Sequence, residues 1–285
     1  MNRGLTVSLR CGADELFFSR STPLRITAGG LSGFDYPEIS VELSSDVGGK
    51  VSYPRDTAVC SRHLSIRFEL ADTEIFKSIR DRVNRMMSPG RKMTLTTCFL
   101  GRRRTMEVLA AKAPEYVFET LSDTVQIVLN LTAPAPYFTE GVLYRSSVPT
   151  AVPLMTFPLS FIKGYGTTPS LASAKNSAVI HNPGDTDCPV TVRLYAEGTV
   201  REPYIMLGTA KIRLTGELEA GDVLKIESGD GKHLVTVNEA VRHDVDRKSR
   251  FFALAPGENT VVIGAAYGGV SLRGAFEFMP RYFGM

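Results

Sequence analysis

Guanidinium and ammonium groups are concentrated in one stretch of this 285-residue chain, between Lys77 and Arg104. The stretch contains a single acidic residue, Asp81, among nine basic ones: Lys77, Arg80, Arg82, Arg85, Arg91, Lys92, Arg102, Arg103 and Arg104. Clustered guanidinium groups bind oxyanions well, so this pattern favours a contact surface for phosphate or for an acidic partner. The alternative is a solvated helix face that is followed by an exposed hairpin tip at Gly101.

Five residues of this stretch form the candidate partner-contact patch: Arg91, Lys92, Arg102, Arg103 and Arg104. No run of aromatic residues is interleaved with them to stack on bases, which disfavours readout of a nucleic acid. Residues 1–140 carry 18 Lys+Arg against 16 Asp+Glu, a net of +2, and residues 141–285 carry 15 against 14, a net of +1. Neither half therefore has the charge of a basic nucleic-acid module.

The remaining chemistry-bearing residues are scattered. No two of the four histidines have the spacing of metal ligands, and no Cys-x-x-Cys pair occurs. These residues are His63, His181, His233 and His243, and Cys11, Cys60, Cys98 and Cys188. No nucleophile stands beside a base at a defensible spacing, and Pro169 takes the place of the third glycine in a would-be dinucleotide fingerprint that begins at Gly164. The sequence predicts no enzyme activity, no cofactor and no metal site.

A glycan-binding module that acts in host-surface adhesion is the alternative function. His181-Asn182-Pro183 is similar to the sugar-contact motif of galectins, but the order and spacing differ and Gly184 stands where an Arg is expected. The chain contains no Trp, the residue best suited to stack on a sugar ring. Tyr can replace Trp in this role, so the glycan reading stays open. A third reading, a hydrolase, has only the length of the chain in its favour.

The elements that must position these residues are mostly strands. One helix is expected from about Thr73 to Met87, where Ile75, Ile79 and Val83 recur every fourth residue. Asp72 or Thr73 would cap its start. Two-residue alternation predicts the neighbouring strands, which are half-buried in an antiparallel sheet. They lie near residues 5–9, 24–27, 39–43, 63–70, 92–100, 105–111 and 124–131.

Prolines divide the chain. They are frequent from Pro134 to Pro169, so we expect a boundary near residue 140, with a domain at 1–140, a second at 141–285, and a Pro-rich arm or linker at about 141–175. Beyond Asn176, short strands and turns recur without a helix, which predicts a β-sandwich. Its clearest part runs from Leu218 to Ile263 and contains a Gly229-Asp230-Gly231 hairpin turn.

The N-terminus lacks the apolar run of a signal peptide, and no window approaches the roughly 18 apolar residues of a membrane span. We therefore expect a protein that is made in a reducing cytoplasm and is not inserted into a membrane. In that compartment the cysteines are expected to be free thiols.

Several motifs of the second half occur together in one known family. They are Phe157-Pro158-Leu159, Asn182-x-Gly184-Asp185, Leu218-x-Ala220-Gly221-Asp222, Phe252-x-Leu254-x-Pro256-Gly257-x-Asn259 and Arg281-Tyr282-Phe283-Gly284. The first half agrees more loosely, through Gly33-Phe34-Asp35-Tyr36-Pro37 and Pro136-Tyr137-Phe138. On these residues the chain resembles the distal tail protein of long-tailed, non-contractile bacteriophages, the siphophage tail-tip and baseplate hub family.

The resemblance implies a mainly β fold with two parts. The N-terminal domain would be β-rich with one helix, a tail-tube-like fold that forms a ring, typically a hexamer. The C-terminal domain would be a galectin-like or carbohydrate-module-like β-sandwich.

The resemblance also implies a structural virion protein at the tail tip of a phage, prophage or tail-like particle. Its partners would be further copies of itself, the tail tube protein and a tail-associated baseplate or fibre protein. DNA would pass through the ring without specific binding. The protein would be assembled in the bacterial host cytoplasm.

Overall fold

The computed structural model describes residues 4–19, 21–45, 52–70, 74–119, 124–148 and 176–285. Over these residues the chain is mainly β, with 22 strands, one α-helix and one short 3₁₀ turn. It divides into two compact units. The first comprises residues 1–141 together with Arg281–Met285, and the second comprises Val142–Pro280.

The first unit is built on an eight-stranded antiparallel sheet with the order β2-β1-β7-β8-β10-β6-β3, in which β9 also pairs with β10. The strands are β1 (Thr6–Cys11), β2 (Asp14–Phe18), β3 (Leu24–Ser32), β6 (Arg62–Leu70), β7 (Met93–Phe99), β8 (Arg102–Ala110), β9 (Glu115–Glu119) and β10 (Thr124–Ala133). The link between β8 and β10 is short, because only Ala110 and Leu109 of β8 pair with β10.

Alternation along these strands builds the core of the first unit. On β6, Leu64, Ile66, Phe68 and Leu70 are buried, while His63 and Arg67 on the opposite face are exposed. Each buried residue lies opposite an apolar residue of β10, and the ring centroids of Phe18 and Phe68 are 4.8 Å apart. The period-two pattern of the sequence thus predicts this sheet correctly.

The helix α1 (Phe76–Met86) packs on this core through Ile79, Val83 and Met86. It begins later than the sequence predicts. Ile75 occupies the N-cap position and its side chain makes no capping hydrogen bond. The predicted caps at residues 72 and 73 lie outside the described residues. Because the apolar stripe recurs every three to four residues, it identifies the buried face whichever residue begins the helix.

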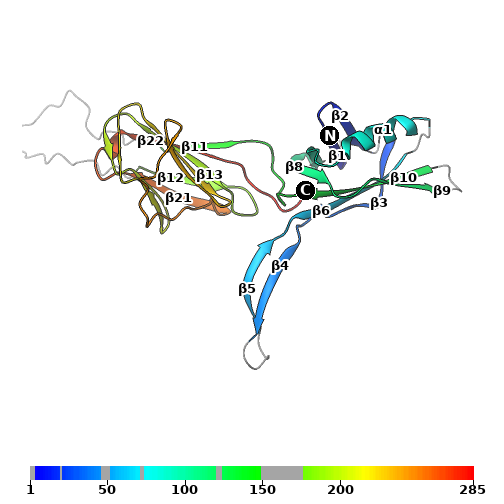
Figure 1. Cartoon of the computed structure of the whole chain (residues 1–285), viewed down its shortest axis with the longest axis horizontal. Helices are drawn as coiled ribbons and strands as arrows, with labels where there is room; N and C mark the ends of the chain where they lie inside the picture. The colour runs from blue at the N-terminus through cyan, green and yellow to red at the C-terminus, as the bar shows by residue number, and fades with distance from the viewer. Residues whose placement is uncertain (1–3, 20, 46–51, 71–73, 120–123, 149–175) are drawn as a thin grey trace, which may run out of the picture. The chain divides into compact units, whose positions relative to one another are not determined.

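Two strands of the first unit stand apart from its sheet. The strands β4 (Ile39–Ser45) and β5 (Ser52–Val59) pair antiparallel with each other, in a two-stranded sheet of their own, and project from the rest of the unit (Figure 1). We call this pair the ribbon. The sequence predicts a half-buried strand at residues 39–43, whereas every residue of β4 is exposed. The strand was therefore predicted correctly and its environment was not.

The C-terminal residues return to the first unit. Phe138 and Tyr282 form an antiparallel bridge through two backbone hydrogen bonds of 2.9 Å, and the side chain of Tyr282 joins the core of this unit. We call Arg281–Met285 the C-terminal segment. Local sequence pattern does not predict this return, because it depends on contacts between residues far apart in the chain.

The second unit is a sandwich of two sheets that share one core. A six-stranded sheet has the order β11-β22-β13-β18-β19-β20, and a four-stranded sheet has the order β12-β21-β15-β16. Their strands are β11 (Tyr144–Val148), β12 (Asn176–Asn182), β13 (Val190–Ala196), β15 (Tyr204–Leu207), β16 (Ala210–Arg213), β18 (Val223–Gly229), β19 (Lys232–Val237), β20 (Ala240–Val241), β21 (Gly257–Gly264) and β22 (Leu272–Phe278). The short strands β14 (Val200–Arg201) and β17 (Glu217–Leu218) pair with each other. A 3₁₀ turn, η1, covers Gly269–Ser271.

Two predictions for the second unit can be checked directly. The hairpin turn between β18 and β19 is confirmed, since Gly229 pairs with Lys232 and both intervening residues have positive φ, 53° at Asp230 and 71° at Gly231. The predicted Pro-rich arm or linker at about 141–175 is wrong in its first part, because residues 144–148 form the strand β11, which pairs with β22. Residues 149–175 of that arm lie outside the described residues.

Candidate partner-contact site

The predicted basic patch is split by the hairpin that carries it. Leu100 and Gly101, both with positive φ, form the two-residue turn between β7 and β8, so Arg102 and Arg103 are exposed at the start of β8. Arg104, one position further on, points into the unit and is only 7% exposed. Successive strand residues point to opposite faces, which separates Arg103 from Arg104.

Arg104 holds the C-terminal segment. Its Nη1 donates a hydrogen bond to the carbonyl oxygen of Gly284, and its guanidinium carbon lies 4.0 Å from the centre of the Tyr282 ring. Such a cation–π contact and charge-assisted hydrogen bond stabilise the segment against the unit. This residue therefore has an internal role, and we leave it out of the contact surface.

Lys92 and Arg103 line a polar cleft of about 440 Å³ on the outer face of β1, β7 and β8. The other lining residues are mostly hydroxyl-bearing or charged: Ser8, Arg10, Gly12, Glu15, Thr94, Thr96 and Thr105. Lys92 is paired with Glu107 at 2.9 Å in an exposed ion pair. The cleft is thus hydrophilic and only weakly basic, and it offers hydrogen bonds more than apolar contact area.

Arg91 lies near a second set of charges, around Asp14. Arg85 donates two hydrogen bonds to the Asp14 carboxylate, of 2.9 and 3.2 Å. These bonds lower the pKa of Asp14 below its usual value, and the positive charges of Arg82 and Arg91 act in the same direction. The basic residues of α1 and of the loop that follows therefore share one surface region.

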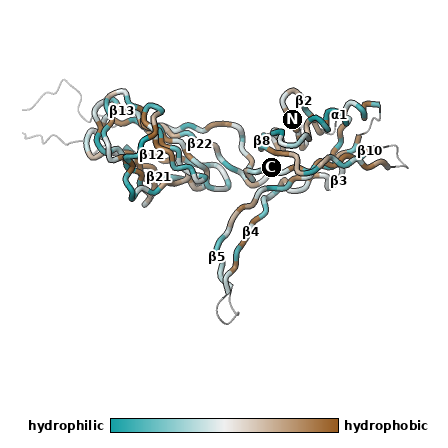
Figure 2. Tube along the Cα trace, in the orientation of Figure 1, coloured by the Kyte–Doolittle hydropathy of each residue, from teal (hydrophilic) through white to brown (hydrophobic). Residues whose placement is uncertain are grey.

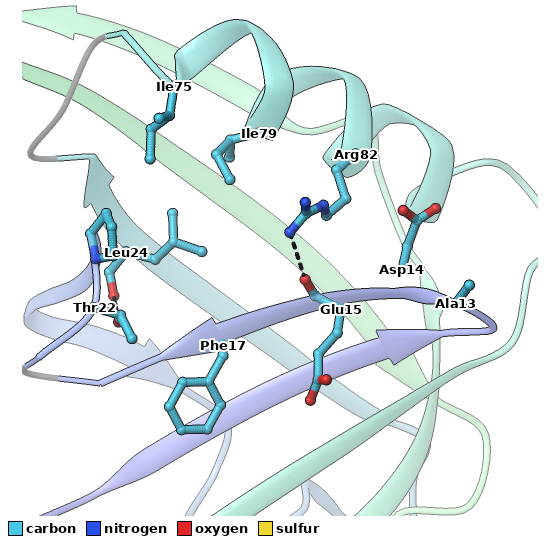
Figure 3. A pocket seen from close by; sticks show the side chains of 10 residues that line it. Ala13, Asp14, Glu15, Phe17, Thr22, Leu24, Ile75, Ile79 and Arg82 are labelled. Carbon is cyan, nitrogen blue, oxygen red and sulfur yellow. Dashed lines mark hydrogen bonds between the residues drawn. The ribbon is translucent and has the colours of Figure 1, made fainter.

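A groove of mixed polar and apolar lining, about 510 Å³ in volume, adjoins these charges between α1 and the strands β2 and β3 (Figure 3). We call it the α1 groove. Its lining residues are Ala13, Asp14, Glu15, Phe17, Thr22, Pro23, Leu24, Ile75, Ile79 and Arg82. Phe17 is 46% exposed, and Arg82 closes one end by donating a 3.2 Å hydrogen bond from Nη1 to the carbonyl oxygen of Glu15. The Phe17 ring points away from α1 (Figure 3), so the groove presents mixed polar and apolar surface beside a cationic helix.

The ribbon presents the other exposed apolar surface of the first unit. Ile39, Val41 and Leu43 lie on one face and are 48%, 50% and 64% exposed. Their cross-strand partners on β5 are Val59, Thr57 and Pro54, so the face is apolar apart from the hydroxyl group of Thr57. Hydrophobic positions recur along the ribbon in Figure 2. We call this the apolar face of the ribbon.

The opposite face of the ribbon carries one acidic pair. Glu42 lies directly opposite Asp56 in the register. Like charges at directly opposed positions repel and destabilise a strand pair. The ribbon therefore carries an exposed apolar face and a like-charge pair that contributes nothing to its own stability.

In the second unit, the motif considered for sugar contact is structural. The side chain of Asn182 is 1% exposed, and its Nδ2 donates to the carbonyl oxygens of Thr186 and Leu254 at 3.2 and 2.9 Å. Its Oδ1 accepts a hydrogen bond from the Gly184 amide. Asn182 fixes the loop after β12 and is not available to a ligand.

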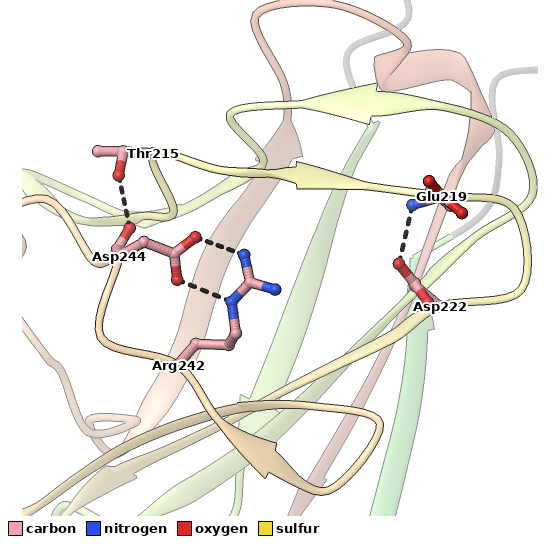
Figure 4. Close-up of polar contacts among 5 residues, drawn as sticks. All are labelled: Thr215, Glu219, Asp222, Arg242 and Asp244. Carbon is pink, nitrogen blue, oxygen red and sulfur yellow. Dashed lines mark hydrogen bonds and ion pairs between the residues drawn. The ribbon is translucent and has the colours of Figure 1, made fainter.

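The motifs that carry the family resemblance likewise fix turns. Asp222 accepts a hydrogen bond of 2.8 Å from the Glu219 amide (Figure 4) and another of 2.8 Å from Nδ2 of Asn238, and these bonds lower the pKa of Asp222. Asn259 exchanges hydrogen bonds with the backbone of Ala255. A turn that is closed by a side chain tolerates few replacements, which explains why such residues mark a family.

No membrane-crossing helix and no group of His, Cys, Asp and Glu that could hold a metal ion occur among the described residues. All four cysteines are free thiols, with Cys188 buried and the other three partly buried.

This chain is similar to known phage tail proteins in part of its sequence and in its fold. Residues 183–282 match the family model of the siphovirus-type tail component, C-terminal domain. The fold matches the crystal structure of SPP1 Dit (gp 19.1), which is described as a paradigm of hub adsorption apparatus in phages that infect Gram-positive bacteria. The TM-score is 0.67 and the sequence identity is 11%, and the match covers 96% of this chain and 98% of the SPP1 Dit chain. The resemblance to distal tail proteins is thereby confirmed.

Two further similarities are weaker. The chain aligns with a component of the phage P2 baseplate in its activated conformation with Ca, at a TM-score of 0.44 and 11% identity over 99% of both chains. The corresponding baseplate structure with Sr has a TM-score of 0.42 and 8% identity, again over 99% of both chains. These scores are too low to support an argument. No curated protein matches the chain.

Two features that the sequence did not predict lie outside the residues that match the tail-component family model. Both the ribbon and the α1 groove belong to the first unit, outside the matched residues 183–282. The signals for them were present in the sequence, as alternation at residues 39–43 and as an apolar stripe on the helix. What the sequence could not show is that Ile39, Val41 and Leu43 stay exposed.

Proposed function

We propose that this chain is a structural virion protein that forms a hexameric ring at the distal end of a phage tail. The ring would join the tail tube to the host-adsorption apparatus and leave a channel for DNA. The first unit would form the ring, and the second would decorate it. The proposal assigns no catalytic step, and it locates the protein in the virion after assembly in the host cytoplasm.

The observation that carries this proposal is the fold match to a hub protein along nearly the whole chain, together with the tail-component domain at 183–282. The small net charge of +3 is consistent with a channel that DNA must pass without being held, since many phosphate contacts would bind it tightly. The partners in this proposal are other copies of the chain, the tail tube protein and a baseplate or fibre protein.

The exposed surfaces of the first unit support oligomerisation. A soluble monomer rarely exposes contiguous apolar surface of the kind found on the ribbon, and a closed ring covers such surfaces on every subunit.

Native mass spectrometry and negative-stain microscopy of the purified full chain test the proposal. We expect a six-subunit ring, formed alone or on addition of the tail tube protein. A monomer at every concentration, with no ring in the presence of the tube protein, would overturn it.

A further inference from the structure

The outer face of the first unit's sheet carries a row of hydroxyl groups. Ser8 lies directly opposite Thr96, and Thr96 lies directly opposite Thr105, so three hydroxyl-bearing residues follow one another across β1, β7 and β8. An antiparallel bridge from Thr105 to Thr139 extends the row by one residue. Neighbouring strands are about 4.8 Å apart, so these side chains recur at a nearly constant spacing. We call the row from Ser8 to Thr105 the hydroxyl row.

Three hydroxyl groups of this face are available to a ligand. Thr105 is engaged, since its Oγ1 lies 3.2 Å from the carbonyl oxygen of Thr139 and 3.3 Å from the Thr139 hydroxyl. Ser8, Thr94 and Thr96 also line the polar cleft, and within the described part of the chain their hydroxyl groups have no hydrogen-bond partner. A hydroxyl group can both donate and accept. The face therefore offers donor and acceptor sites that the strands hold at fixed positions.

An exposed aromatic ring stands at one end of the hydroxyl row. Phe17 of the edge strand β2 lies directly opposite Ser8 and is 46% exposed, whereas its neighbours Leu16 and Phe18 are fully buried. Its ring points away from α1, which packs on the core at the other face of the sheet (Figure 3). An aromatic ring presents an apolar face to a ligand. A sugar ring has an apolar face of C–H groups and a rim of hydroxyl groups, which is the complement of this arrangement.

The charges of the cleft favour a neutral ligand. Arg10, Arg103 and Lys92 line it, but so does Glu15, which lies directly opposite Arg10 in the register. Lys92 is already paired with Glu107 at 2.9 Å. Two carboxylates therefore offset two of the three cations, and both would repel a phosphate or another anion. Guanidinium and carboxylate groups also hydrogen-bond to neutral hydroxyl groups, as donors and as acceptors respectively.

We propose that this face binds a neutral saccharide, whose ring stacks on Phe17 and whose hydroxyl groups bond along the hydroxyl row. The cleft of about 440 Å³ lies within the range of about 300–1,000 Å³ that small-molecule sites occupy. A protein partner would need a larger apolar centre than one phenyl ring provides. The site lies in a different unit from the Asn182 motif, whose side chain is closed to ligands.

This inference goes beyond the proposed ring and does not depend on it. Every residue of the site belongs to the first unit of one copy. A single chain can therefore bind the saccharide whether or not copies assemble, and the two proposals can fail separately.

Four neutral trisaccharides test the proposal on the full chain. Cellotriose, maltotriose, mannotriose and chitotriose differ in linkage and in the orientation or substitution of their hydroxyl groups, and saturation-transfer difference NMR detects the binding of each. We expect saturable binding of at least one of them, which isothermal titration then quantifies. Inorganic phosphate is the anionic probe and should not compete. Absence of saturable binding to all four would overturn the proposal, and so would competition by phosphate, because the cleft would then be an anion site.

Two substitutions locate the binding. Phe17→Ala removes the ring, and Thr96→Val removes one hydroxyl group while it keeps the β-branched shape that suits a strand. Each should weaken binding about tenfold. The matched controls are Phe99→Ala and Thr57→Val, which remove an exposed ring and a hydroxyl group of an exposed residue elsewhere in the first unit and should bind as wild type does. Wild-type affinity in both Phe17→Ala and Thr96→Val would overturn the site.

Native mass spectrometry of the same samples separates this inference from the proposed function. A ring that binds none of the saccharides would overturn the inference alone. A chain that binds a saccharide but never forms a ring would count against the proposed function alone. Thermal unfolding establishes that each variant is folded, and Thr96→Val carries the test if Phe17→Ala is not.

Discussion

A single buried guanidinium joins three distant parts of the first unit. Arg62 is 1% exposed, and its Nε donates to the carbonyl oxygen of Gly33 at 2.5 Å, while Nη1 donates to those of Pro136 and Phe283 at 3.2 and 2.5 Å. Burial lowers the pKa of Arg62 to about 10, and the charge of Asp35 partly opposes this shift. Arg62 therefore ties the base of the ribbon to the two places where the chain leaves and re-enters this unit.

Replacing Arg62 should destabilise the first unit. In Arg62→Met, three carbonyl oxygens in buried or partly buried hydrogen bonds lose their donor, so we expect a loss of about 2–4 kcal/mol. The matched control is Arg67→Met on the same strand, whose side chain is exposed and whose loss should change stability by less than about 0.5 kcal/mol. Urea unfolding gives the free energies, and hydrogen exchange should show faster exchange at residues 33–36 and 282–285. Equal stability of the two variants would contradict the role given to Arg62.

A second residue-scale prediction concerns an ion pair in the second unit. Nε and Nη2 of Arg242 donate to the two carboxylate oxygens of Asp244 at 2.9 and 2.6 Å, and this pairing lowers the pKa of Asp244 below its usual value (Figure 4). Gly216 makes the pair possible, since a Cβ at that position would lie 2.2 Å from Oδ2 of Asp244.

The sign of the pH dependence follows from the lowered pKa. A carboxyl group with a lower pKa in the folded state adds stability above its unfolded pKa, near 3.8, and that contribution is lost as the pH falls through the folded value. Because both side chains are about a third exposed, Asp244→Asn should cost only about 1 kcal/mol at neutral pH. Thermal unfolding of wild type and variant at pH 7 and pH 2.5 checks this, with a smaller difference expected at pH 2.5. A difference that is constant with pH would contradict it.

At the scale of elements, alternation and turn chemistry predict most of the strands. The strands β6 and β10 lie where residues 63–70 and 124–131 were predicted to form strands, and the Asp230-Gly231 turn closes as its positive φ values require. These features are local, because the sheet period and the turn conformation are fixed within a few residues. The environment of an element is not local, which is why the strand at 39–43 was predicted and its exposure was not.

The basic patch illustrates the same limit. The sequence groups Arg102, Arg103 and Arg104 as one cationic cluster, and the period of a strand alone implies that Arg103 and Arg104 face opposite ways. Which face is the interior depends on the C-terminal segment, since Arg104 is buried where it contacts Tyr282 and Gly284. A contact between residues about 180 positions apart leaves no trace in local pattern.

At the scale of the whole molecule, the second unit is an insertion within the first. The chain leaves the first unit after Gly141 and re-enters it at Arg281, and the flanking residues Phe138 and Tyr282 are paired by two backbone hydrogen bonds. Each unit has its own core of buried apolar residues. This arrangement gives the second unit two covalent connections to the first, and it makes the C-terminal segment part of the ring-forming unit that we propose.

The insertion predicts how the chain can be divided. A fragment of residues 1–141 lacks the acceptor of Arg104 and one acceptor of Arg62, and it also lacks the buried ring of Tyr282, so it should be unstable or aggregate. Joining Gly141 to Arg281 through a short Gly-Ser loop should restore a folded first unit, because Phe138 and Tyr282 are already paired as in a hairpin.

Thermal unfolding and hydrogen exchange compare the stability of the 1–141 fragment with that of the joined fragment. We expect the joined fragment to be more stable than residues 1–141 by about 3 kcal/mol or more, since it regains a buried aromatic side chain and two charge-assisted hydrogen bonds. A Tyr282→Ala version of the joined fragment serves as the control and should lose most of this gain. If residues 1–141 fold as stably as the joined fragment, the C-terminal segment is not part of the first unit's core, and the roles of Arg62 and Arg104 must be revised with it.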